Sequence, residues 1–572
     1  MNQPWARTAI VLSLFAVIFV ALSVASYTEK SATWDEPQHV TTGYLALKRH
    51  DYRTDPEHPP FLRMWAALPL LAIGDIKLDS TVIDRTSPAD WVGLGQFLFC
   101  HRFMYKANDA DRLLYAARFM IVMLGVLLGV LLYWWVNDWL GFWPAVVTLA
   151  FYTIEPNEQA HASLVTTDFG AGCFIFGAIY FLWRVCRQPS TANIVGLVAF
   201  FVLANISKFS ALILGPIVVV LLGIGLVRPR TLTLTKASGI VALLAVVTWL
   251  SIWAVYGFRY TPSRSNAWLF QLQNYPLVQQ RIPRLASIGE WIDAHHLLPN
   301  AYTQGFLLGQ AKAQVRAAYL AGNYSIDGWW YYFPAAFLIK TPVALVILLV
   351  SGILVCATRW RHLGLKNEAF VVVPIALYLG SAMVARLNIG LRHILPIYPF
   401  VLLLAAAAVK ELLDARKRGG WIVLGLLAVF WGSEFGRAYP SNLAFFNKFV
   451  GGPRNGYKYL ADSNLDWGQD LKPLRKWMDR NNISHINLAY FGTADPSYYE
   501  IDCTYLPGTD FPGEGLVRSP QLPGYVAVSV TVLDGVYLSD QGRAFYKPLR
   551  EMVPTADIGH SIHVYWIERP WW

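Results

Sequence analysis

Charged side chains are scarce in this chain. Only 15% of its 572 residues are Asp, Glu, Lys or Arg, whereas 55% are hydrophobic and 15% are aromatic. In a soluble globular domain roughly a quarter of the residues are charged. The low charge therefore excludes an ordinary soluble domain, and the many Trp and Tyr are typical of rings that gather at membrane interfaces. The composition predicts a protein that crosses a membrane several times.

Signatures of several other chemistries are also missing. The five cysteines have no Cys-x-x-Cys or metal-ligand spacing, and Cys100 and Cys503 could pair only as an alternative to the expected free thiols. There is no Gly-x-Ser-x-Gly elbow, His-Glu-x-x-His helix or Walker loop, so hydrolase, zinc-protease and ATP-driven mechanisms lack their usual signals. The net charge of +10 is spread along the chain, which argues against nucleic acid as a partner.

About eleven segments approach the roughly 17 to 25 apolar residues that a membrane crossing requires. The first lacks a convincing cleavage site and is interpreted as a retained signal anchor. Segment 61–74, with Arg63 near its start and prolines nearby, is predicted to be an interfacial helix instead. The eleven segments are 9–27, 115–136, 140–155, 168–186, 193–207, 209–227, 236–257, 333–356, 368–386, 394–410 and 420–436.

Basic residues in the short loops predict the orientation, because such loops stay in the cytoplasm. With an odd number of spans, the N-terminus then lies inside and the outer loops 28–114 and 258–332 face the periplasm or the exterior. The sequence predicts a multi-pass protein of the inner cell membrane. The basic residues are Arg184, Arg187, Arg228, Arg230, Lys236, Arg359, Arg361, Lys366, Lys410, Arg416, Lys417 and Arg418.

The tail of the chain has a different pattern from the rest. Short alternating runs such as 486–491 and 525–530 are separated by Gly and Pro, and 471–480 is predicted to be a helix. We expect a mainly α polytopic membrane domain over 1–449, followed by a small α/β extramembrane domain over 450–572.

Two adjacent acids follow the first span directly, in Thr33-Trp-Asp-Glu-Pro-Gln-His39. Asp35 and Glu36 are therefore expected at a membrane face, although acids of an ordinary solvated loop are the alternative. Their side chains point in different directions, so only one of them can act on a given atom. One acid can serve as a general base while its neighbour orients a helix end, a metal or an acceptor.

Further ionisable residues are expected on the same outer face. Ionisable groups near a membrane are costly and usually mark a functional site, and cations there could neutralise an anionic leaving group such as a lipid-linked phosphate. For Lys208, Arg386 and Arg118 the alternative is snorkelling to the interface. Glu57 with His58, His161 with Asp168, or His295 with His296 could hold a divalent cation, without diagnostic spacing. The set also includes Asn388, Arg392 and His393.

These pieces, in this order, resemble the membrane-embedded GT-C glycosyltransferases, specifically the superfamily of protein O-mannosyltransferases and lipid A aminoarabinose transferases (glycosyltransferase family 39-like, bacterial phospholipid carrier-dependent branch). The resemblance extends over about residues 8 to 475. It is carried by Trp34-Asp-Glu-Pro37, Glu57-His-Pro-Pro60, Leu164-Val-Thr-Thr-Asp168, Lys208, Trp330-Tyr-Tyr-Phe-Pro334, Ile339-Lys-Thr-Pro342, Asn388-Ile-Gly-Leu-Arg-His-Ile-Leu-Pro396 and Asp462-Ser-Asn-Leu-Asp-Trp-Gly-Gln-Asp470.

The resemblance implies inverting transfer of a hexose or pentose from a polyprenyl-phosphate carrier on the outer membrane face. It implies Asp35 as general base, Glu36 as its acidic neighbour and Asp168 as a second acidic site residue. Glu57 matches an acid that helps to hold a metal in some relatives. His58 stands where those relatives have a lysine near the donor phosphate.

Charge and position, more than motif matches, make Lys208, Arg392 and His393 candidates to bind the donor. The acceptor remains open between a lipid, a glycan and a protein, because the tail does not resemble the β-trefoil of eukaryotic protein mannosyltransferases. Two other functions also stay open. A transporter would place its polar groups near the middle of the membrane, and a non-catalytic scaffold would use its outer domain to bind partners.

Overall fold

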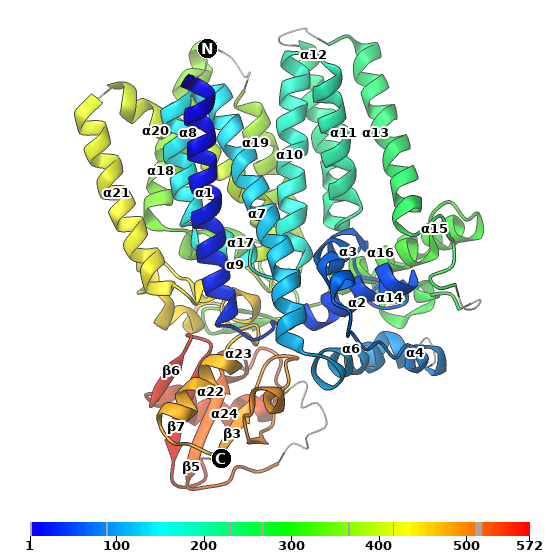
Figure 1. Cartoon of the computed structure of the whole chain (residues 1–572), viewed down its shortest axis with the longest axis vertical. Coiled ribbons are helices and arrows are strands. Elements are labelled where there is room, and N and C mark those ends of the chain that lie inside the picture. The colour runs from blue at the N-terminus through cyan, green and yellow to red at the C-terminus, as the bar shows by residue number, and fades with distance from the viewer. Residues whose placement is uncertain are drawn as a thin grey trace.

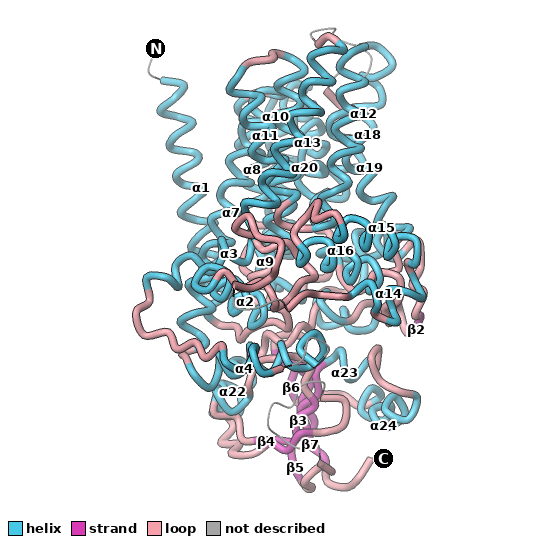
Figure 2. Tube along the Cα trace, turned by 90° about the vertical axis from the view of Figure 1, so that its right-hand side faces the viewer, coloured by secondary structure: helices cyan, strands magenta, loops and turns pink. Residues whose placement is uncertain are grey.

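The long helices lie at one end of the molecule and the C-terminal domain at the other. The computed structural model describes residues 3–86, 90–227, 232–264, 268–363, 367–415, 417–509 and 518–571. A layer of short helices and loops separates the two ends, as Figures 1 and 2 show. The start of the chain lies at the far end from the C-terminal domain (Figure 1). Arg228, Arg230, Lys366 and Arg416 of the predicted cytoplasmic loops lie outside the described residues.

Helices occur at all eleven predicted spans, which confirms the mainly α polytopic fold. By length and apolar composition, seven of the described helical regions can cross a membrane, or up to eight if a bent pair is one span. Helices α8, α11 and α19 have 12, 15 and 16 residues and are shorter than a straight crossing requires. The helices are α1 (Gln3–Thr28), α7 (Ala110–Leu140), α8 (Phe142–Thr153), α10 (Thr167–Arg187), α11 (Thr191–Asn205), α12 (Leu214–Val227), α13 (Leu234–Val255), α18 (Val343–Leu363), α19 (Ala369–Val384), α20 (Tyr398–Ala415) and α21 (Lys417–Ala438).

The bundle has a buried centre and an exposed periphery. Helices α10 and α20 are almost entirely buried, whereas α1, α13 and α21 expose most of their apolar side chains. A glycine brings α18 close to α20, because a Cβ on Gly352 would lie 1.9 Å from the carbonyl oxygen of Leu404. The apolar periphery is the surface that lipid would contact.

The predicted span 333–356 is a broken helix. Helix α17 (Tyr332–Lys340) ends two residues before Pro342, and the axis bends by 116° before α18 begins. Proline disfavours a helical conformation in the residue before it, and Thr341 is extended. The side chain of Lys340 turns inward and donates hydrogen bonds to the carbonyl oxygens of Leu443 and Phe445, each over 3.0 Å.

The middle layer is built from short elements of the two outer loops and from α9, which lies between α8 and α10. Segment 61–74, which was predicted to be an interfacial helix, forms a short α-helix followed by a 3-10 turn. The elements are α2 (Glu36–Arg49), α3 (Phe61–Ala67), α4 (Thr81–Arg85), α6 (Gln96–His101), α9 (Pro156–His161), α14 (Pro276–Arg281), α15 (Pro283–Ala294), α16 (Asn300–Lys312), β1 (Ala318–Leu320) and β2 (Asn323–Ser325).

The tail folds into the predicted small α/β domain, with a helix before its first strand. Its sheet has the order β4-β3-β5-β7-β6. Strand β3 is parallel to β4 and β5, whereas β7 is antiparallel to β5 and β6. The elements are α22 (Leu471–Arg480), β3 (Ile486–Ala489), β4 (Cys503–Tyr505), β5 (Gly524–Ser529), α23 (Val530–Asp534), α24 (Asp540–Glu551), β6 (Ala556–Ile558) and β7 (Ile562–Ile567). The five cysteines all lie within the described residues, and none of them forms a disulfide.

A buried carboxyl group beside this sheet makes stability depend on pH. Burial raises the pKa of Asp466 from 3.8 to about 7, although the backbone N–H of Thr531 donates to it over 2.9 Å. The folded state therefore binds the proton more tightly than the unfolded chain, and the stability due to Asp466 falls as the pH rises through this range. We expect Asp466→Asn to gain on the order of 2 kcal/mol relative to wild type between pH 5 and pH 8. Thermal unfolding in detergent at several pH values measures this gain, and parallel curves for the two proteins would contradict it.

Candidate active site

The first acid of the pair stands at the start of a helix and faces a cation. Asp35 is the residue before α2, and its side chain is 26% exposed. Its Oδ2 atom lies 3.0 Å from Nη1 of Arg392, which belongs to the turn that leads into α20. Asp35 is thus accessible, and its charge is balanced from the membrane side.

The second predicted acid lies beside the same arginine. Asp168 is in the first turn of α10, and only 2% of its side chain is exposed. Its Oδ1 forms an ion pair with Nζ of Lys208, and its Oδ2 lies 3.5 Å from Nη1 of Arg392. Arg392 therefore bridges Asp35 and Asp168, and four of the residues predicted from sequence form one cluster.

The neighbour of Asp35 points away from this cluster. Glu36 is fully buried and accepts hydrogen bonds from Nε and Nη2 of Arg118 over 2.8 and 2.5 Å, and from the backbone N–H of Thr33 and Val165. Burial alone would raise the pKa of Glu36, but Arg118 holds it below its usual value. Glu36 is therefore an ionised anchor that ties the first outer loop to the segment before Asp168.

Arg118 was expected either at the interface or in a site, and it is in neither place. It is fully buried, and besides Glu36 it donates to the carbonyl oxygens of Tyr27, Lys30 and Ser31. Its guanidinium thus fixes the chain between the end of α1 and the start of α2. The position of Asp35 depends on this contact.

His58, near the cluster, has a strongly lowered pKa. Burial lowers the pKa of His58 to about 3, and the nearby cations Lys208 and Arg63 add to the effect against the attraction of Asp55. His58 packs edge-on against His39, with ring centroids 5.7 Å apart. A neutral His58 can exchange a hydrogen bond with a ligand but cannot neutralise a phosphate as the lysine at this place in the resembled family would.

Two buried nitrogen atoms of the cluster have no hydrogen-bond partner within the described part of the chain. They are Nε2 of His393 and Nε of Arg392. Buried polar atoms are nearly always paired. These two atoms, beside Lys208 and Asp168, mark the place where a polar ligand would complete the cluster.

Glu57 does not assemble a metal site with its neighbours. Its Oε1 is 2.5 Å from Nζ of Lys312 on α16, so the carboxylate already has a cationic partner. Among the described residues no three His, Cys, Asp or Glu side chains come together in a way that could hold a metal ion. The residues at Glu57 therefore do not fit a divalent cation, and no step below depends on one.

Other predicted residues of the outer face lie apart from the cluster or serve the fold. Arg386 forms an exposed ion pair with Asp327, and the side-chain oxygen of Asn388 accepts from the backbone N–H of Trp329 over 2.6 Å. His295 bonds its own helix through the carbonyl of Trp291. His161 is buried in α9, and burial lowers its pKa to about 3.

Residues of the tail that sequence reasoning did not assign to the site also reach it. The guanidinium of Arg392 lies 4.1 Å from the ring centroid of Trp467, in the segment that leads to α22. The backbone N–H of Trp34 donates to the carbonyl of Trp467 over 2.8 Å. The only signal for Trp467 is its place in the motif that begins at Asp462.

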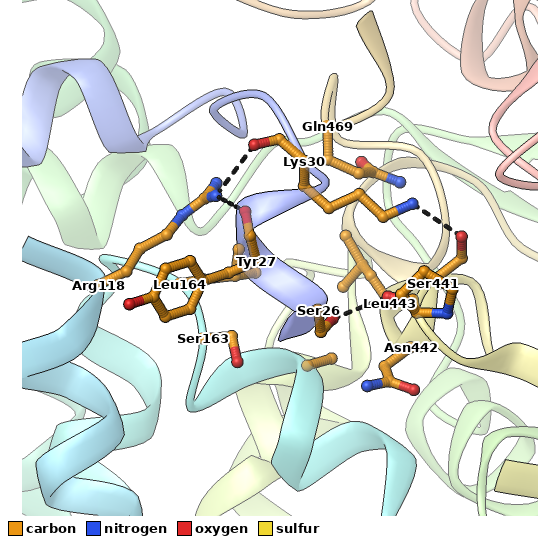
Figure 3. Close-up of a pocket in the computed structure, with 12 residues that line it drawn as sticks. Ser26, Tyr27, Lys30, Arg118, Ser163, Leu164, Ser441, Asn442, Leu443 and Gln469 are labelled. Atoms are coloured by element: carbon orange, nitrogen blue, oxygen red, sulfur yellow. Dashed lines mark hydrogen bonds between the residues drawn. The ribbon is translucent and has the colours of Figure 1, made fainter. Parts of the chain in front are cut away.

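A small pocket lies beside the Glu36–Arg118 contact (Figure 3). It is lined by the end of α1, the loop around Ser441, and Gln469. At this pocket Nζ of Lys30 donates hydrogen bonds to Oγ of Ser441 over 2.7 Å and to Oδ1 of Asp470 over 2.6 Å. The cations at this pocket are therefore paired, and it forms the junction between the first span and the tail.

No protein-family model matches the chain, and the search of curated proteins gives no match. Among solved structures, the chain is similar to ArnT from Cupriavidus metallidurans bound to undecaprenyl phosphate, with a TM-score of 0.49 and 13% identity over 99% of this chain and 98% of that one. It is also similar to the Archaeoglobus fulgidus oligosaccharyltransferase in complex with Zn and sulfate, with a TM-score of 0.47 and 12% identity over 91% and 68% of the two chains. Similarity at this level assigns no activity to any residue, so function has to be argued from the site.

Proposed function

We propose that this membrane protein is an inverting glycosyltransferase that uses a polyprenyl-phosphate-linked sugar. The observation that carries the proposal is the bridge of Arg392 between Asp35 and Asp168, with Lys208 on the second acid. One accessible carboxylate and two cations beside unpartnered nitrogen atoms suit an anionic leaving group and a single displacement. The motif resemblance to GT-C glycosyltransferases supports the same reaction.

In this reaction a hydroxyl oxygen of the acceptor attacks the anomeric carbon of the donor sugar. Asp35 takes the hydroxyl proton as the new carbon–oxygen bond forms. The bond from the anomeric carbon to the phosphate oxygen breaks, and its electron pair leaves with the polyprenyl phosphate. Lys208 and Arg392 neutralise that charge, while Asp168 fixes both cations and Nε2–H of His393 donates a hydrogen bond to the phosphate.

The place of the cluster favours this function over transport. Asp35 directly precedes α2, and α2 lies in the layer of short helices between the long helices and the C-terminal domain (Figure 1). Arg392 contacts Asp35 there. A transporter would be expected to hold its polar groups near the middle of the bundle. We propose that this side is the periplasmic or extracellular face of the inner membrane and that the N-terminus is cytoplasmic.

Removal of one cation tests the proposal. In proteoliposomes with a panel of radiolabelled polyprenyl-phosphate sugars, we expect wild type to release carrier phosphate from one donor. Lys208→Gln should lower kcat/KM for that donor by at least about 100-fold, because a charge on the leaving phosphate loses its partner. Arg386→Gln is the matched control, since that arginine pairs with Asp327 on the surface, and it should stay within about twofold. If Lys208→Gln and Arg386→Gln lower kcat/KM equally, Lys208 does not bind the donor.

A further inference from the structure

Three aromatic rings form a row that leads from Asp35 into the C-terminal domain. Trp34 stacks on Phe491 with centroids 5.0 Å apart and planes at 24°, and Phe491 stacks on Tyr537 at 5.6 Å and 18°. Phe491, in the middle, is buried, whereas Trp34 and Tyr537 are partly exposed. Because Trp34 immediately precedes Asp35, the row begins beside the proposed base.

The tail holds the first ring in place. Oγ1 of Thr493 donates to the carbonyl of Trp34 over 2.7 Å, and the N–H of Trp34 donates to the carbonyl of Trp467 over 2.8 Å. Both polar groups of the Trp34 backbone are therefore bound by the C-terminal part of the chain. The row therefore joins Trp34, near the start of the sequence, to Phe491 and Tyr537 of the C-terminal domain.

Polar groups border the other end of the row. The exposed guanidinium of Arg316 lies 5.4 Å from the ring centroid of Tyr537, and the hydroxyl of Tyr537 donates to Oδ2 of Asp462. Burial acts to lower the pKa of Arg316, but Tyr537 and the carboxylates of Asp462 and Asp35 raise it overall. Arg316 therefore lies within electrostatic reach of the proposed base.

We propose that the row from Trp34 to Tyr537, with Arg316 and Asp462 at its edge, binds the acceptor, and that the acceptor is a glycan. A sugar ring offers a face of C–H groups to an aromatic ring and hydroxyl groups around its edge. The partly exposed rings match the face, and the charged side chains match the hydroxyls. Phe491 follows β3 and Tyr537 lies between α23 and α24, and these elements belong to the C-terminal domain, beyond the long apolar helices (Figure 1). This position favours a hydrated acceptor over an acyl chain. This inference rests on the proposed glycosyl transfer.

An acceptor panel tests the class of molecule. Wild type in proteoliposomes with its labelled donor is offered cellotetraose, a serine-rich peptide and a diacylglycerol in separate reactions. We expect label in the tetrasaccharide. Label in the peptide or in the lipid alone would overturn the inference.

Variants of the row test the place. Tyr537→Ala should raise the tetrasaccharide concentration at half-maximal rate at least tenfold, with a much smaller fall in kcat, and Tyr537→Phe should keep most of the affinity because it keeps the ring. The matched control is Trp566→Ala, which removes another exposed ring of the same domain that packs on Tyr525 with centroids 4.8 Å apart. An acceptor KM that is the same in Tyr537→Ala and Trp566→Ala would overturn the inference.

Hydrolysis of the donor, in which water attacks the anomeric carbon in place of the acceptor and the carrier phosphate leaves, separates the two proposals. If wild type hydrolyses the donor, Asp35→Asn does not, and no label reaches the tetrasaccharide, the acceptor inference alone is wrong. If wild type neither hydrolyses any donor nor transfers label to any of the three acceptors, the proposed function is wrong as well.

Discussion

Asp35→Asn should abolish sugar transfer while the protein folds normally. The amide keeps the size and one hydrogen-bond acceptor of the carboxylate, but it cannot take the proton of the acceptor hydroxyl. We expect kcat to fall by about 100- to 10,000-fold, the range that a positioned general base contributes. Initial rates of label transfer in proteoliposomes measure this loss at donor concentrations well above KM.

The control for this prediction is folding and donor binding. Asp35 is 26% exposed, and within the described part of the chain its one ion pair is with Arg392, so the variant should keep the thermal stability of wild type in detergent within a few degrees. Donor binding should be kept or strengthened, because Arg392 is then free for the phosphate. Transfer by Asp35→Asn at a tenth of the wild-type rate or more would exclude Asp35 as the base.

Arg118→Met should produce the largest loss of stability. The substitution leaves the carboxylate of Glu36 buried and without its cation, and it removes the donor to three backbone carbonyls. Breaking a buried ion pair from one side costs about 3 to 5 kcal/mol. We expect a strongly lowered melting temperature in detergent and a transfer rate that falls with the fraction of folded protein.

Two further variants show where this loss comes from. In Glu36→Gln/Arg118→Met the uncompensated charge is gone, so the double variant should be more stable than Arg118→Met alone. Arg112→Met, on the same helix, breaks an exposed pair with Asp75 and should cost less than about 1 kcal/mol. If Arg118→Met is no less stable than Arg112→Met, the anchoring role of Glu36 is wrong.

Hydrophobic run length predicted the positions of the helices because burial and lipid contact both require apolar residues. It could not predict the break before α18, since a proline next to Thr341 ends a helix only where other contacts satisfy the freed backbone groups. Here Nδ2 of Asn447 donates to the carbonyl oxygens of Leu338 and Thr341. Run length alone also does not fix how many helices cross fully, because α8 and α11 are apolar but short. Apolar composition indicates that a helix is surrounded by lipid or by other apolar side chains. It does not indicate how much of the membrane the helix crosses.

The sequence selected four candidate site residues that lie together in the structure, but it could not predict how they pair. Asp35, Asp168, Lys208 and Arg392 were singled out because ionisable residues near a membrane are costly, and the structure brings them together. The neighbour Glu36 carried the same sequence signal but points to Arg118 instead. Which of two adjacent acids faces a site depends on the first turn of α2, which composition and spacing do not specify. The contacts of Trp467 with Arg392 and Trp34 form only in the tertiary structure, because Trp34 is hundreds of residues away in the sequence.

The contact between Arg392 and Asp35 has a consequence for the order of events. Before the donor arrives, Nη1 of Arg392 holds the Asp35 carboxylate in an ion pair over 3.0 Å. A donor phosphate that draws Arg392 towards itself breaks that contact and frees the carboxylate only when a sugar is already in place. The protein would then bind its substrates in a compulsory order, donor before acceptor, and an acceptor that arrives first would meet a carboxylate that Arg392 still occupies. Initial-rate patterns with both substrates varied would intersect accordingly, and the free carrier phosphate would inhibit competitively against the donor.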